Sequence, residues 1–323
     1  MTQDHGHQHS DHDHSDHDHG HDHHGHSHGL GHSHVPTNFG RAFALTTALN
    51  LALVVVQVVY GLIADSMALL ADAGHNFGDA IGLILAWIAY TLGRVKATER
   101  FTYGFRSASI LSAFANAVLL LVATGAIVWE ALRRISEPPE VAGVTVMIVA
   151  GVGVVINGLS AWILMAGQKN DLNIRGAYLH LIADAAVSVG VVLGGAVIVA
   201  TGWNWVDPAV SLVIAAVIVW GTWGLLRESF ELSMQAVPKG IALGEVRSYL
   251  EGLPGITGVH HLHVWAMSTT ENALTVHLVF PAGHPGDAFL TRVSDALSHK
   301  FRIHHPTIQI EIADGAPCAI ENH

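Results

Sequence analysis

Long apolar stretches separated by short polar loops dominate the chain between Gly40 and Arg227. Six of these stretches are long enough to cross a hydrocarbon core of about 30 Å, because a helix rises about 1.5 Å per residue. The pattern predicts six membrane-spanning helices over residues 42–63, 67–92, 107–132, 141–166, 172–201 and 206–226.

After Arg227 the pattern becomes that of a small soluble domain. Helical spacing and strand alternation predict, in order, a helix, two strands, a second helix and a third strand. The predicted elements cover residues 243–250, 259–268, 273–280, 287–301 and 307–312. We therefore expect an α-helical membrane protein with six transmembrane helices and a cytoplasmic α+β domain of αββαβ order. The apolar strand faces suit dimerisation as well as a monomer core.

The first 34 residues form a low-complexity segment in which His alternates with Asp, Gly and Ser. Such a segment has almost nothing to bury and is expected to be disordered. Imidazole and carboxylate groups together bind borderline divalent ions such as zinc, and a string of them favours weak, exchangeable binding. The domain organisation predicted from these patterns is a tail over 1–40, a membrane domain over 41–230 and a metal-binding and dimerisation domain over 236–315.

Composition supports this organisation. Half of the residues are apolar and the mean hydropathy is +0.41, values that are typical of a multi-span membrane protein. The net charge of −11 lies partly in the tail and gives no basic face for a nucleic acid, so no nucleic-acid partner is expected. The single cysteine, Cys318, excludes an intrachain disulfide framework.

Basic residues in the short loops set the expected orientation. The first and fifth loops have no Lys or Arg, whereas the second and fourth are basic, so these two should face the cytoplasm together with both termini. Arg133 and Arg134 at the outer end of the third span disagree with this assignment, but two residues do not outweigh the other loops. The predicted location is the inner cell membrane. The basic loop residues are Arg94, Lys96, Arg100, Arg106, Lys169 and Arg175.

Two spans each contain a His and an Asp four residues apart: His75 with Asp79, and His180 with Asp184. On a helix, both members of such a pair project from one face. Counting about 1.5 Å per residue puts each His about 12 Å deep and each Asp about 18 Å deep, so the two pairs bracket the midplane and can face each other. Charged groups at this depth are costly and usually functional, although helix–helix hydrogen bonding is the alternative.

Two imidazoles and two carboxylates form the tetrahedral ligand set that zinc prefers. Magnesium would require six oxygen ligands and copper(I) would require sulfur ligands. A zinc hydrolase would require an open coordination position and a catalytic Glu, and the HExxH motif is absent. The pattern therefore favours carrying the ion over using it in an enzyme. Asp72, on the same helix face as Asp79, is either an accessory ligand or a partner at the helix start.

The chain resembles the cation diffusion facilitator family, specifically its zinc-efflux branch, from about Arg41 to Glu311. Six motifs in this order carry the resemblance: SMALLADAGHNFGD (66–79), FTYGFRS (101–107), LHLIADA (179–185), GVHHLHVWAMS (258–268), LTVHLVF (274–280) and HHPTIQIE (304–311).

The resemblance implies a homodimeric, proton-coupled exporter of divalent metal with a metallochaperone-like cytoplasmic domain. It maps the transport site onto the same four residues that the spacing selects, His75, Asp79, His180 and Asp184. A His at the first of these positions implies zinc, with cadmium or cobalt as secondary ions. For the cytoplasmic domain the resemblance implies a further metal site. A second ion at that site is doubtful, because Leu290 and Gln309 stand where some family members have His. The implied ligands are His260, His277, His304 or His305, and Glu311.

Strand alternation places His261 and His263 on the face opposite His260, so neither is expected to join that site.

Rival functions give different outcomes on mutation. A same-fold transporter for another divalent metal is the closest rival, and ion competition separates it from a zinc exporter. A membrane-tethered metal sensor would tolerate His75→Ala, and an intramembrane metalloenzyme would turn over a substrate in detergent. Loss of metal export in His180→Ala, with normal folding and dimerisation, would exclude both the sensor and the metalloenzyme.

Overall fold

A computed structural model describes residues 41–165 and 172–312. Within these ranges, the side chains of residues 41–45 and 172–175 are not described. The predictions for the His-rich tail, Lys169 and Cys318 therefore lie outside the described residues.

Six long helices follow one another and are each long and apolar enough to cross a membrane. Their bounds agree with the hydrophobic pattern to within a few residues, except that the sixth helix ends seven residues later than predicted. That extension is polar, and Arg227 Nε donates to Glu231 Oε1 at 2.7 Å along it. The helices are α1 (Arg41–Ile63), α2 (Met67–Gly93), α3 (Ala108–Ser136), α4 (Gly143–Met165), α5 (Leu172–Thr201) and α6 (Val206–Ser233).

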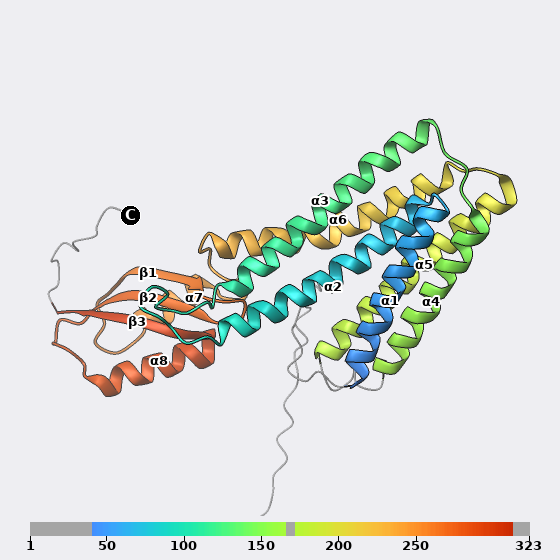
Figure 1. Cartoon of the computed structure of the whole chain (residues 1–323). Helices are drawn as coiled ribbons and strands as arrows, with labels where there is room; N and C mark the ends of the chain where they lie inside the picture. Colours follow the sequence, from blue (N-terminus) through green and yellow to red (C-terminus); the bar gives the residue numbers. More distant parts are fainter. Residues whose placement is uncertain (1–40, 166–171, 313–323) are drawn as a thin grey trace, which may run out of the picture.

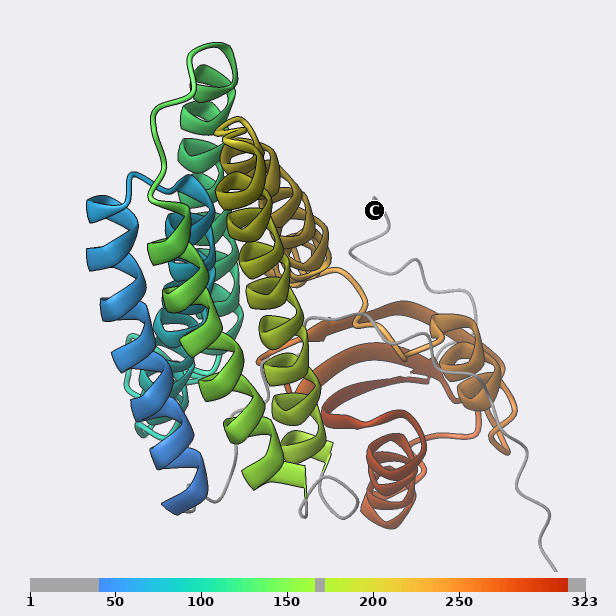
Figure 2. The ribbon, with the colours of Figure 1, turned by 90° about the vertical axis from the view of Figure 1, so that its right-hand side faces the viewer.

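The helices form a bundle in which α1, α2, α4 and α5 lie together and α3 runs beside α6 (Figures 1 and 2). A buried apolar cluster that includes Leu69, Val146, Val191 and Ile218 connects these layers. Figure 1 shows α2, α3 and α6 reaching the sheet domain at one end of the bundle.

Glycines let α3 approach α2 closely. A Cβ atom at Gly78 would lie 2.6 Å from Leu120 Cδ1, and one at Gly82 would lie 2.8 Å from Asn116 Nδ2. These glycines are four residues apart and therefore share one helix face. α2 therefore packs closely against α3 along this face.

The start of α2 is held by a buried carboxylate from another span. Asp207, at the beginning of α6, accepts hydrogen bonds from the Met67 backbone N–H at 2.6 Å and from the Ser66 hydroxyl. Ser66 is also the local N-cap, and its hydroxyl accepts from the Leu69 N–H at 3.2 Å. A negative group at a helix N-terminus is stabilising, so Asp207 joins α6 to the helix that carries HNFGD.

The sheet domain has the predicted αββαβ order. Strands β1 and β2 pair antiparallel, and β2 and β3 pair parallel in the order β1-β2-β3. Leu250, Leu274, Leu278 and Leu297 are among the buried residues that form its core between the sheet and the helices. The elements are α7 (Leu243–Glu251), β1 (Gly258–Ala266), β2 (Asn272–Val279), α8 (Asp287–Phe301) and β3 (Ile303–Glu311).

Strand β3 begins four residues earlier than the sequence pattern predicts. Ile303 is fully buried in the core, and its neighbours His304 and His305 carry polar side chains that hide the alternation. The fold class predicted from the sequence is confirmed.

We predict that Gly78→Val destabilises the detergent-solubilised protein by about 1–3 kcal/mol, because the added branches meet Leu120 in a packed interface. Gly158→Val on α4 is the matched control, since a Cβ atom there meets nothing within 4 Å. Thermal unfolding of both purified variants measures the difference. Equal melting temperatures for the two would show that α2 and α3 are not closely packed.

Candidate metal sites

The four ionisable residues predicted from the two spans meet between α2 and α5. His180 Nε2 lies 3.1 Å from Asp79 Oδ2 and 3.5 Å from Asp184 Oδ2. His75 Nε2 lies 3.5 Å from Asp184 Oδ1 and 3.8 Å from Asp79 Oδ2. Each imidazole thus faces the carboxylates of both helices. We call these four residues the helix group.

The helix group is enclosed on one side and open on the other. Asp184 is 2% exposed, whereas the side chains of Asp79 and His180 are 31% and 46% exposed. His75 is intermediate, at 20%. Asp79 and His180 therefore form the open side of the group, and Asp184 forms its closed side.

The donor set of the helix group fits a divalent ion. Ligand atoms of His75, Asp79 and Asp184 lie within 4.8 Å of one another. Asp184 Oδ1 is buried and has no hydrogen-bond donor among the described residues. A buried carboxylate oxygen without a donor is costly unless a cation or proton faces it. His180 Nε2 contacts both carboxylates, at 3.1 Å and 3.5 Å, so the donor set is two imidazoles and two carboxylates, which suits tetrahedral zinc.

Asp72 lies outside the helix group and joins three helices next to it. Its Oδ2 accepts hydrogen bonds from Gln57 of α1 at 2.5 Å and from Ser188 of α5 at 3.1 Å. Asn76 Nδ2 donates to Gln57 Oε1 at 3.3 Å. The sequence leaves two roles open for Asp72, an accessory ligand or a partner at the helix start. Asp207 is the residue that holds the helix start. Spacing within one segment gave no signal for Asp207, because its partners are about 140 residues away.

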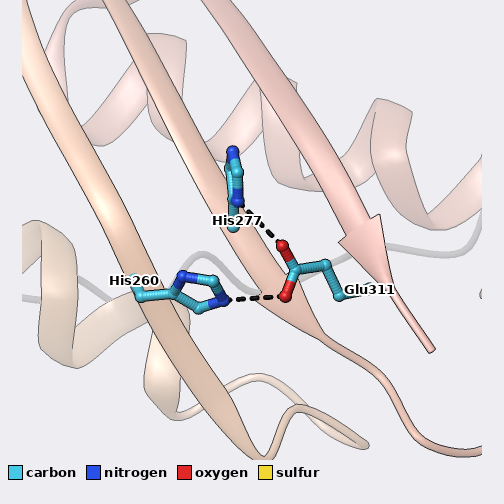
Figure 3. A group of neighbouring side chains, drawn as sticks. All are labelled: His260, His277 and Glu311. Atoms are coloured by element: carbon cyan, nitrogen blue, oxygen red, sulfur yellow. Dashed lines mark hydrogen bonds and ion pairs between the residues drawn. The ribbon is translucent and has the colours of Figure 1, made fainter. Parts of the chain in front are cut away.

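A second group comes from the three strands of the sheet domain, and Figure 3 shows its side chains pointing toward one another. Glu311 at the end of β3 bridges the two histidines. Its Oε2 lies 2.9 Å from His260 Nε2, and its Oε1 lies 2.8 Å from His277 Nδ1. We call these three residues the sheet group. Their ligand atoms lie within 4.8 Å of one another.

Two opposing effects act on the Glu311 carboxyl. Desolvation raises its pKa, but the hydrogen bonds and charges of His260 and His277 outweigh that effect and leave the pKa below its usual value. Glu311 is therefore an ionised carboxylate over the physiological pH range.

His304 and His305 do not join the sheet group. They stand at the opposite end of β3 from Glu311, where His305 pairs in register with Ala273. The His305 Nε2 atom lies 2.8 Å from Arg106 Nη1, and Arg106 also forms an ion pair with Glu271. These contacts join the loop between α2 and α3 to the sheet domain.

In the sequence, Arg106 stands out only as a basic loop residue and as part of the FTYGFRS motif, and neither feature indicates this junction. The junction also includes hydrogen bonds from the Ser107 hydroxyl to the Met267 carbonyl and from the Thr269 N–H to the Ser109 hydroxyl. Its partners are far apart in sequence, so no local pattern could have identified it.

His261 departs from the predicted strand alternation. Its ring lies 5.4 Å from that of His260 and 5.0 Å from that of His277, measured between centroids. A register shift between His260 and His263 breaks the alternation in β1. The expectation that His261 and His263 point away from His260 is therefore wrong. His263 pairs with Thr275 and His260 with His277, two residues of β2 that share one face, so His263 also lies on the face of His260.

The chain matches family descriptions over nearly its whole described length. Residues 44–232 match the cation efflux transmembrane domain, and residues 238–313 match the cation efflux protein cytoplasmic domain. The class is thus a multi-pass membrane protein with a cytoplasmic domain.

Three curated relatives each align with most of the chain. The cadmium, cobalt and zinc/H(+)-K(+) antiporter of Bacillus subtilis is 34% identical, covering 87% of this chain and 92% of its own. The metal cation efflux system protein CzcD of Cupriavidus metallidurans is 36% identical, covering 90% and 92%. The zinc transporter ZitB of Escherichia coli is 35% identical, covering 86% and 90%. The chain belongs to the cation efflux family of transporters, the cation diffusion facilitators.

The lowered pKa of Glu311 predicts a pH dependence of stability. A carboxyl whose pKa is lower in the folded state stabilises the fold above its unfolded pKa, and this contribution is lost as pH falls through the folded pKa. The melting temperature of metal-free wild type should therefore exceed that of Glu311→Gln at pH 6, and the difference should vanish below the lowered pKa. Differential scanning fluorimetry in chelator measures it. A difference that grows on acidification would contradict the ion-pair assignment.

Proposed function

We propose that this protein exports zinc from the cytoplasm in exchange for protons, using His75, Asp79, His180 and Asp184 as the transport site. The observation that carries the proposal is the convergence of two His–Asp pairs from α2 and α5, with Nε2-to-oxygen distances of 3.1–3.8 Å. Four protein ligands with no catalytic Glu beside them suit binding and release of an ion rather than activation of water.

The choice of zinc rests on ligand chemistry and on the relatives. Two imidazoles with two carboxylates provide borderline and hard donors in tetrahedral number, which suits zinc better than magnesium or copper(I). The Escherichia coli relative is named a zinc transporter, and the Bacillus subtilis relative is named for cadmium, cobalt and zinc. Cadmium and cobalt are therefore the second candidate cargoes, to be distinguished by ion competition.

Proton coupling follows from the protonation states that the ligands must have. Zinc binding requires neutral imidazoles and ionised carboxylates, so a proton held by His75 or His180 must leave when zinc enters. The two carboxylates balance the ion's two charges, so the loaded group is formally neutral. After zinc is released, protons on the imidazoles replace its positive charge. Without them the two carboxylates would be uncompensated negative charges in the bilayer interior. The antiporter name of the Bacillus subtilis relative agrees with this exchange.

Export works against an inside-negative membrane potential. Each positive charge that leaves costs about 2.3 kcal/mol per 100 mV, and each returning proton offsets one such charge. Two protons per zinc make the exchange electroneutral, and one leaves it electrogenic. In this cycle α2 and α5 alternately open the helix group to the two sides.

The proposed assembly is a homodimer in the inner cell membrane with both termini in the cytoplasm. In this arrangement cytoplasmic zinc can reach both the sheet group and the His-rich tail. The membrane domains add further contacts between the two copies. The match to the family's cytoplasmic domain over residues 238–313 supports this location. We propose zinc as a structural or regulatory ion at the sheet group.

We predict that Asp184→Asn abolishes zinc uptake driven by a pH gradient in proteoliposomes, because the amide removes both the charge and an anionic ligand. Asp65→Asn is the matched control. It makes the same chemical change in the turn between α1 and α2, where Asp65 Oδ1 accepts from Arg134 at 2.7 Å, and it should retain most of the flux.

A zinc-sensitive dye inside the vesicles reports uptake, and a pH-sensitive dye in parallel vesicles reports the coupled proton movement. Equal zinc flux in wild type and Asp184→Asn would contradict the transport site. Zinc flux without proton movement would contradict the coupling alone.

A further inference from the structure

We propose that His261 is the fourth protein ligand of the metal site formed by His260, His277 and Glu311. The proposal rests on the cytoplasmic metal site proposed above and adds a ligand that strand alternation excludes. Three protein ligands leave one position of a tetrahedral site to another donor, and closed structural zinc sites use four protein ligands.

The bulge in β1 brings His261 to the face of the sheet that carries the site. His260 pairs with His277 and His263 pairs with Thr275, so two residues of β1 oppose the single residue Val276. Leu262 is buried in the core with Val276. Since Leu262 takes the inward position, the extra residue His261 is left on the outward face beside His260.

The backbone at His261 is held in an uncommon conformation. Its φ is +48°, in the left-handed region that is unfavourable for a residue with a Cβ. Such outliers persist where the surrounding structure requires them, and they concentrate at binding sites. The bulge is thus a local distortion whose result is to add an imidazole to the sheet group.

The distances leave His261 within reach of a shared ion. Its ring centroid lies 5.0 Å from that of His277 and 5.4 Å from that of His260. The rings of His260 and His277 are themselves 5.2 Å apart, so the three imidazoles are nearly equidistant. Zinc–nitrogen bonds are about 2.0 Å long. The ligand atoms that already lie within 4.8 Å of one another are those of His260, His277 and Glu311, so binding through His261 requires its half-buried side chain to rotate toward them.

Neighbouring polar residues are less suitable as the fourth ligand. Gln309 is in register with His277, but its amide Nε2 donates to Glu311 Oε1 at 3.4 Å and thus acts as a donor. His263 is exposed, and its ring centroid is 6.2 Å from that of His261, on the far side of the bulge from His260. His263 therefore serves as the matched control.

The test is residue-resolved modification of histidines by diethyl pyrocarbonate in the full-length protein in detergent, read by fragment mass spectrometry across a zinc titration. This readout assigns each histidine separately, so zinc bound elsewhere on the chain does not obscure it. We expect zinc to protect His260 and His261 at the same concentration while His263 stays reactive. Continued reactivity of His261 at zinc concentrations that protect His260 would overturn the proposal.

A substitution gives the second readout. His261→Asn removes the imidazole but keeps a residue that tolerates the left-handed backbone region, and it should raise the zinc concentration for half-protection of His260 at least about tenfold. His263→Asn should leave that concentration unchanged. An unchanged concentration in His261→Asn would also overturn the proposal.

Zinc flux in proteoliposomes distinguishes failure of the ligand assignment from failure of the proposed function. Absence of flux with intact protection of His260 and His261 contradicts the transporter proposal alone and supports the ligand assignment. Normal flux with no protection of His260 at any zinc concentration overturns the ligand assignment and leaves transport standing.

Discussion

The cost of ionised groups in hydrocarbon governs the arrangement of the membrane domain. A single buried carboxylate such as Asp184, which is 2% exposed, is tolerated only beside positive charge. The facing His–Asp pairs of α2 and α5 give each carboxylate two imidazole neighbours. In the proposed transport cycle a divalent ion or protons complete the balance. The hydrogen bond from Ser188 of α5 to Asp72 of α2 joins the same two helices next to the group.

Polar contacts around the helix group hold α2 against its neighbouring helices. Asp207 of α6 fixes the start of α2, and Asp72 connects α2 to α1 and α5 through Gln57 and Ser188. Just before α3, Arg106 contacts Glu271 and His305 of the sheet domain. The helix that carries HNFGD is therefore held at its start by Asp207 and further along by Asp72, and the α2–α3 loop is joined to the sheet domain.

Periodicity in the sequence was enough to predict the six spans and the αββαβ order, because each depends on spacing within one segment. The facing of the two HxxxD pairs was predictable because the same spacing recurs at matching depth in two spans. Features that depend on pairing between distant segments were not predictable. The bulge at His261 reversed the expected strand faces, and the register of β3 put His305 beside Arg106 instead of near Glu311. Asp207, whose partners lie in another span, gave no local signal.

A zinc-edge anomalous difference map from crystals of the zinc-loaded protein would test the proposed transport site, because it locates the ion without reference to activity. We expect a peak between α2 and α5, about 2.0–2.2 Å from one ligand atom of each of His75, Asp79, His180 and Asp184. Peaks confined to the sheet domain, with ordered helices and none between α2 and α5, would contradict it.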